Sequence, residues 1–376
     1  MRKLLLLLCF IILFGCAPDS KELDQRSTIL GLAIDKGEEK LFSISIQLPI
    51  LTESGGEGSS SPQGGNFETF TTEADSVWEG LSKLEAMTPS VLFFGHLKAI
   101  LISESVAKTH LKKIFDSLER EAAIGNQIFL LIVEDQAGEF MKKESPLVSL
   151  PSLYLDRFFQ ADQKLSRTSD VKLFEYRRDS NMISETASLP IAKLSNEQIL
   201  IEGMAIIKDD KLVSKLDPRE VGFSELLKKN KLDFMNYDVV LENDVKVTYS
   251  RIRLKQVVDY KQTNPVQISL EISGTGEIVE VNDVDQRVDA SFVKEADEAV
   301  GKKMEENLQD IIVKMQEINA EPWLFGHRIW ALSPKYYETL DWESGGWSNA
   351  KVDISVDFRT SNTGEKGAMN KTKIGR

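Results

Sequence analysis

The first sixteen residues determine which part of this chain can fold into a globular body. A basic start leads into an almost unbroken apolar run over 4–14, which ends at Gly15 and Cys16. A basic segment, a short apolar run and a small residue before a cleavage point are typical of a secretory signal peptide. The run is shorter than the roughly 20 apolar residues that a membrane-spanning helix needs. We therefore predict that residues 1–15 are a signal peptide and that the remaining chain folds outside the cytoplasm.

Cys16 makes this signal more specific. Its place directly after Gly15 resembles the lipobox of bacterial lipoproteins, in which the cysteine is lipidated and becomes the first residue of the mature chain. Two acyl signals hold a protein firmly at a membrane, whereas one holds it weakly. We therefore predict an S-diacylglyceryl group and an N-acyl group on Cys16, followed by a tether over 16–28. The alternatives are an ordinary signal peptide with an incidental cysteine, or a short anchor that is never cleaved.

Composition limits how the rest of the chain can be stabilised and what it can bind. Its two cysteines are Cys9 and Cys16, so the folded body has no cysteine left for a disulfide and depends on packed cores. The three histidines argue against a multi-histidine metal site. The formal net charge of −13 argues against nucleic acid as a partner and against a broad electrostatic hold on anionic lipid.

Motifs that carry catalysis or bind cofactors are absent from the sequence. It contains no Gly-x-Ser-x-Gly elbow for a serine nucleophile. The glycines of 54–66 lack the lysine and the following helix of a phosphate-binding loop. Acidic pairs such as Asp209-Asp210 and Glu305-Glu306 are interpreted as solvated charge. We therefore predict no catalytic, cofactor-binding or metal site, and a protein that is not an enzyme.

Each of the three histidines is a candidate contact site. His96 follows Gly95 and His327 follows Gly326, each at the start of an apolar segment. Each could make a polar contact there or could be a structural side chain, and the structural role is favoured. His110 lies among lysines and is expected to face solvent.

Aromatic residues gather near the C-terminus of the chain. Aromatic side chains are enriched at protein interfaces. We expect some of them to face a partner subunit, with ordinary core packing as the alternative. The set comprises Trp323, Trp330, Tyr336, Tyr337, Trp342 and Trp347.

The apolar pattern predicts a mixed fold in which β-sheets are packed with helices. Continuous apolar runs such as 128–133 indicate buried strands. Apolar residues at helical spacing over 290–320 indicate a long amphipathic helix, which Pro322 follows. Strands and helices alternate in the first half of the chain, as in mixed α/β or α+β domains.

Domain boundaries are placed where this pattern weakens. After the tether, an N-terminal α+β domain is expected over 29–196, with a flexible loop rich in glycine and serine at 54–66. A middle domain is expected over 197–243. A C-terminal α+β domain over 244–370 would contain the long helix 290–320, whose apolar stripe is expected to cover the sheet of that domain.

Several stretches together resemble the Ger(x)C spore germination proteins, the lipoprotein C-subunits of nutrient germinant receptors in endospore-forming bacteria. Each stretch is weakly specific alone, but their order and spacing span nearly all of the chain after the signal peptide. They are the lipobox at Cys16, the segment 23–35 with Gly31 and Asp35, the segments 95–104 and 132–133, the segment 202–213, and the long helix with Gly326 and the strand 352–358.

The resemblance implies three α+β domains, no catalysis, and assembly with two integral membrane subunits. One of these is the A-type receptor subunit, and the other is a B-type subunit similar to amino-acid transporters. It also implies a lipid anchor on the outer face of the cell membrane or of the inner spore membrane. The alternative is a solute-binding lipoprotein of a membrane transporter, which would need two similar α/β lobes around a cleft.

Overall fold

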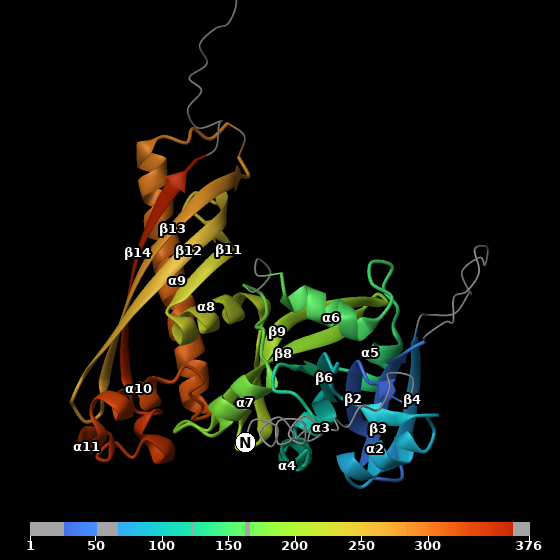
Figure 1. Cartoon of the computed structure of the whole chain (residues 1–376). Helices are drawn as coiled ribbons and strands as arrows, with labels where there is room; N and C mark the ends of the chain where they lie inside the picture. Colours follow the sequence, from blue (N-terminus) through green and yellow to red (C-terminus); the bar gives the residue numbers. More distant parts are fainter. Residues whose placement is uncertain (1–25, 51–66, 122, 162–165, 284, 364–376) are drawn as a thin grey trace, which may run out of the picture.

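The computed structural model describes residues 26–50, 67–121, 123–161, 166–283 and 285–363. Within these ranges the chain has the predicted mixed α+β fold, in which two large β-sheets are packed with helices. Figure 1 shows the larger, N-terminal body beside an elongated C-terminal body. The predicted signal peptide, Cys16 and most of its tether, and the loop 54–66 lie outside the described residues. No described helix is long and apolar enough to cross a membrane.

The N-terminal body is built on an eight-stranded mixed sheet. Its inner strands are apolar on both faces because helices cover both, so β6 and β7 are buried along their whole length. The strands in sheet order are β10 (Lys211–Leu216), β9 (Gln198–Lys208), β8 (Thr186–Ser195), β7 (Phe129–Val133), β6 (Ala99–Ser103), β2 (Gly31–Lys36), β3 (Phe42–Pro49) and β4 (Phe67–Ala74).

Helices form a layer on each face of this sheet. The first face carries α2 (Val77–Glu85), α3 (Glu104–Ala107), α4 (Leu111–Arg120) and α7 (Leu173–Ser180). The second face carries α5 (Ala137–Lys142) and α6 (Pro151–Phe159). Before β2, the short strand β1 (Arg26–Thr28) pairs in parallel with β5 (Val91–Phe93).

Two buried polar side chains connect the sheet to α5 and α6. The Asp35 carboxylate accepts hydrogen bonds from the backbone N–H groups of Ala137 and Gly138, at 2.7 and 2.8 Å, and so caps α5. The Gln47 amide donates to the carbonyl of Met141 at 2.8 Å, and its oxygen accepts from the Ser152 hydroxyl at 2.7 Å. Because buried polar groups need partners, these bonds fix where both helices lie on the sheet.

The C-terminal body is a four-stranded sheet with a long helix along one face. Its strands alternate between buried and exposed residues, because only that face is covered. The elements are β11 (Lys231–Val240), β12 (Lys246–Lys261), β13 (Gln267–Val281), β14 (Lys351–Asn362) and α9 (Ala290–Glu317), with α8 (Pro218–Lys229), α10 (Phe325–Leu332), α11 (Pro334–Tyr337) and η3 (Trp342–Gly346) packed around them.

The long helix agrees with its prediction at both ends to within a few residues. Nearly all of the predicted apolar stripe is buried against the sheet, from Phe292 through Met304 to Met315. The helix also covers the outer edge of β14. Asp297 accepts from the backbone N–H of Thr360 at 3.0 Å, and Glu305 accepts from that of Val356 at 2.8 Å.

The middle domain predicted at 197–243 has no sheet of its own among the described residues. β9 and β10 extend the eight-stranded sheet, and β9 pairs with β8 across the predicted boundary at 196. β11 belongs to the four-stranded sheet, and α8 packs into the same core as that sheet. The apolar pattern is weak near residue 196 because the chain makes a hairpin turn there, between two strands of one sheet. Periodicity does not show whether the strands on either side of a turn pair with each other, so the turn resembled a domain boundary.

Candidate functional site

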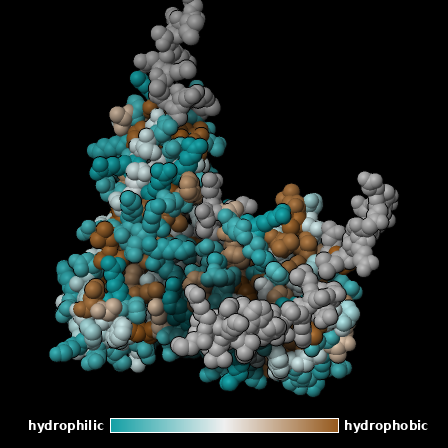
Figure 2. Space-filling view, viewed as in Figure 1, coloured by the Kyte–Doolittle hydropathy of each residue, from teal (hydrophilic) through white to brown (hydrophobic). Residues whose placement is uncertain are grey.

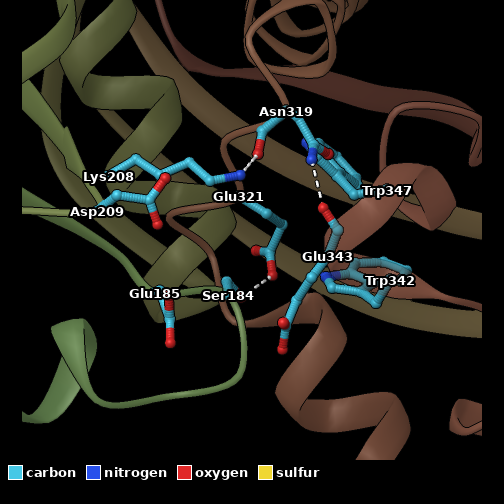
Figure 3. Close-up of a pocket in the computed structure, with 9 residues that line it drawn as sticks. All are labelled: Ser184, Glu185, Lys208, Asp209, Asn319, Glu321, Trp342, Glu343 and Trp347. Carbon is cyan, nitrogen blue, oxygen red and sulfur yellow. Dashed lines mark hydrogen bonds between the residues drawn. The ribbon is translucent and has the colours of Figure 1, made fainter.

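The two bodies meet at the C-terminal end of α9. Three segments of the chain contribute: the link from α7 to β8, the turn between β9 and β10, and the stretch that leads from α9 through α10 to η3. These segments surround a cavity of about 280 Å³ at the junction. Figure 3 shows its side chains, with the Glu321 carboxylate facing Ser184.

Glu321 is the central side chain of the junction and is 2% exposed. Its carboxylate accepts a hydrogen bond from the Ser184 hydroxyl of the N-terminal body, at 2.7 Å. It also accepts from the backbone N–H groups of Trp323, Phe325 and Gly326, at 2.8, 3.0 and 3.1 Å. The last two N–H groups open α10 and have no partner within the helix. One carboxylate therefore caps α10 and binds the two bodies together.

Other polar contacts support the same joint. The ammonium group of Lys208, at the end of β9, donates to the carbonyl of Asn319. The backbone N–H of Glu321 donates to the Thr186 hydroxyl at 3.3 Å. Further along α9, the Lys314 ammonium group lies 2.9 Å from both carboxylate oxygens of Glu220. The same ammonium group donates to the carbonyl of Lys215 on β10 at 2.9 Å, so the end of α9 and the residues that follow it are tied to the N-terminal sheet.

The cavity itself is strongly acidic. Glu185, Asp209 and Glu343 line it together with Glu321, and Lys208 is the cation that lines it. Burial raises the pKa of the Glu185 carboxyl, and the neighbouring Glu343 and Asp209 carboxylates raise it further. Across the described residues no group of three or more histidine, cysteine or acidic side chains is arranged to hold a metal ion.

The predicted aromatic set divides into core, half-buried and exposed residues, and Tyr336 and Tyr337 are the half-buried ones. Trp323, Trp342 and Trp347 are 1–3% exposed and pack together beside the cavity, so the structure places them in the core. Two of the three indole N–H groups bond inside the protein: Trp323 donates to the Ser224 hydroxyl at 3.0 Å, and Trp347 donates to the carbonyl of Ala320 at 2.8 Å. Trp330 is 44% exposed, so it is the tryptophan of this set that could still face a partner.

The structure does not bring the candidate histidines into one site. His96 is exposed, and its ring meets the ring of Phe93 edge-on. His110 was expected in solvent but is half-buried against Phe42 at the start of α4. His327 is half-buried and lies against Trp330.

Glu321, Ser184 and Lys208 were not singled out from the sequence. One local signal was available, because Glu321 is a single acid between Ala320 and Pro322 in an otherwise apolar stretch at the end of a long helix. An acid in such a position is often buried with a partner, but the sequence does not identify the partner. Chemically, the joint can fix an angle between the two bodies.

Burial of Glu321 predicts a pH-dependent stability. Burial raises the pKa of this carboxyl above its ordinary value of 4.5. The four hydrogen bonds lower the pKa, but the effect of burial is larger. The folded state then keeps its proton to a higher pH than the unfolded state. The free energy of unfolding should therefore fall as the pH rises from the pKa of Glu321 in the unfolded state to its higher pKa in the folded state, and should then level off. Glu321→Gln cannot titrate and should lack this component in chemical denaturation between about pH 4 and pH 8. Parallel curves for the two proteins would contradict the prediction.

Fold and joint together define a class: a protein of two unlike α+β bodies, joined by the buried Glu321 carboxylate and by apolar packing of β9 and β10 against the C-terminal core. Two family models match the chain, "Spore germination protein N-terminal domain" over residues 19–194 and "Spore germination B3/ GerAC like, C-terminal" over residues 202–364. The chain belongs to the Ger(x)C family of spore germination proteins. The gap between the two models lies at the hairpin that joins β8 and β9.

Relatives match along nearly their whole length. Spore germination protein GerQC of Bacillus cereus is 20% identical over 96% of this chain and 99% of its own. Spore germination protein KC of Bacillus subtilis is 21% identical over 96% of this chain and 95% of its own. The crystal structure of the GerBC protein has the same fold, with a TM-score of 0.57 and 17% identity over 88% of this chain and 97% of that one.

Proposed function

We propose that this chain is a non-enzymatic lipoprotein subunit of a spore nutrient germinant receptor, needed for receptor assembly or signal relay. The observation that carries this proposal is the end-to-end match to spore germination proteins, from residue 19 to residue 364. In this role the chain is anchored through Cys16 to the outer face of the cell membrane or of the inner spore membrane. Its partners are an A-type receptor subunit and a transporter-like B-type subunit, both integral to the membrane.

The joint at Glu321 supports this role. A protein that relays a signal between membrane partners needs two binding bodies whose relative orientation is defined. The buried carboxylate and the bond from Lys314 on α9 to the carbonyl of Lys215 on β10 supply such a connection. The alternative, a solute-binding lipoprotein, is less well supported, because the described residues form sheets of eight and four strands and not two similar lobes.

Deletion of this chain in its spore-forming host tests the proposal. We expect spores that lack it to lose germination through one nutrient receptor, and the tagged chain to be isolated from spore membranes together with two multi-spanning proteins. Normal germination with every nutrient tested would contradict the proposal. Loss of solute uptake by growing cells, without a germination defect, would support the transporter alternative.

A further inference from the structure

An apolar projection stands out on the N-terminal body. The loop 143–150 between α5 and α6 carries Leu147, which is 81% exposed, the highest value among the exposed large apolar side chains. Pro146 beside it is exposed, and Val148 is half-buried. Figure 2 shows apolar side chains gathered where Figure 1 places this loop and α6. Ile50, at the end of β3, adds a second apolar side chain that is 48% exposed.

The N-terminal segment of the chain enters the sheet at this same end. The backbone N–H of Leu30 donates to the carbonyl of Gln47 at 2.9 Å. The side chain of Gln47 binds Met141 and Ser152, which lie on either side of the loop that carries Leu147. Ile50 follows Gln47 by three residues. Gln47 thus links the N-terminal segment at Leu30, the base of the loop 143–150 and the end of β3.

The length of the preceding chain limits how far this end can lie from a lipid anchor. Nine residues separate Cys16 from Arg26, the first described residue. Even fully extended, such a segment spans only about 30 Å. A chain that is lipidated at Cys16 therefore holds Arg26 within that distance of the bilayer, and Leu30, which bonds to this end of the sheet, follows four residues later. Exposed apolar side chains on a body held so close to lipid can enter the boundary between headgroups and acyl chains.

We propose that the loop 143–150, together with Ile50, is a membrane-contact surface that inserts Leu147 into the phospholipid bilayer. The inference rests on the proposed anchor at Cys16 and goes beyond it, because it assigns which end of the N-terminal body touches lipid. The contact is apolar and needs no positive field, which suits a chain of net charge −13. It gives the anchored protein one orientation on the membrane, so that the partner subunits meet a defined side of it.

Single cysteines test this orientation directly. After signal cleavage and lipidation the native chain has no free thiol, because Cys9 is removed and the Cys16 sulfur carries the diacylglyceryl group in a thioether bond. Leu147→Cys and Ile50→Cys each introduce one site for a fluorophore that is sensitive to water. Val257→Cys is the matched control, because Val257 is an aliphatic residue on β12 of the C-terminal body and is 65% exposed. The full-length, processed chains are reconstituted into vesicles of phosphatidylglycerol and phosphatidylethanolamine.

We expect blue-shifted emission, and quenching by nitroxide-labelled lipid, at positions 147 and 50 but not at 257. Equal, water-like emission at 147 and 257 on vesicle-bound protein would overturn the proposal. So would a shift at 147 that appears only in native spore membranes, which would assign the loop to a protein partner. Labelling of the native chain would instead show a free thiol at Cys16, so failure of the anchor is distinguished from failure of the contact.

Discussion

Replacement of Glu321 by alanine is expected to lower the free energy of unfolding by about 3–5 kcal/mol. The change leaves the Ser184 hydroxyl and the N–H groups of Trp323, Phe325 and Gly326 without their acceptor. A buried donor without a partner costs about 1–3 kcal/mol, and water from the adjoining cavity can reach only some of the four. Chemical denaturation of the purified variant measures the loss.

Glu343→Ala is the matched control, because Glu343 lines the same cavity but its side chain is exposed. We expect that variant to stay within about 0.5 kcal/mol of the native protein. In spores, Glu321→Ala should also reduce the amount of assembled receptor, because the angle between the two bodies is no longer fixed. Equal stability of the two variants would show that Glu321 is not the central element of the joint.

Cys16→Ala is expected to abolish lipid attachment and to cause a severe loss of germination through this receptor. The Cys16 sulfur is the atom that accepts the diacylglyceryl group, and alanine has no sulfur to accept it. The formal charge of −13 gives no general attraction to anionic lipid that could retain the chain. Fractionation of spore membranes and mass spectrometry of the N-terminal peptide measure the two effects.

Cys9→Ala provides the control, because Cys9 lies inside the predicted signal peptide and is removed with it. That variant should be lipidated and recovered with membranes like the native chain. Recovery of Cys16→Ala in membranes at the native level would contradict the anchor. Recovery without germination would instead point to a role of the acyl chains beyond attachment.

The parts of the fold that were predictable depend on local pattern. The helix α9 could be placed because its apolar residues recur at helical spacing and Pro322 lies beyond its end. The strands β6 and β7 could be placed because both are continuous apolar runs. The assignment of β9 and β10 to the first sheet could not be predicted, since periodicity identifies a strand and not its neighbour.

The same distinction applies to the sites. Cys16 could be proposed from sequence because the lipobox is a local motif. Glu321 could not, because its role depends on Ser184, which is far from it in the sequence and comes near it only in the folded protein. Trp342 and Trp347 could have belonged to an interface or a core by composition, and packing between the two bodies settled that they are core.

The place of β14 in the C-terminal sheet has a consequence for the order of folding. This strand is the last of the described chain, and it pairs in parallel with β13, so that Gln267 lies beside Lys351. The crossover between the two strands contains α9, α10, α11 and η3. Contacts between residues so distant in sequence form late and slow the folding of a domain. The sheet therefore closes only after the C-terminal strand has been synthesised. Until then the apolar face of α9 lacks part of its cover, and apolar surface exposed in this way promotes aggregation.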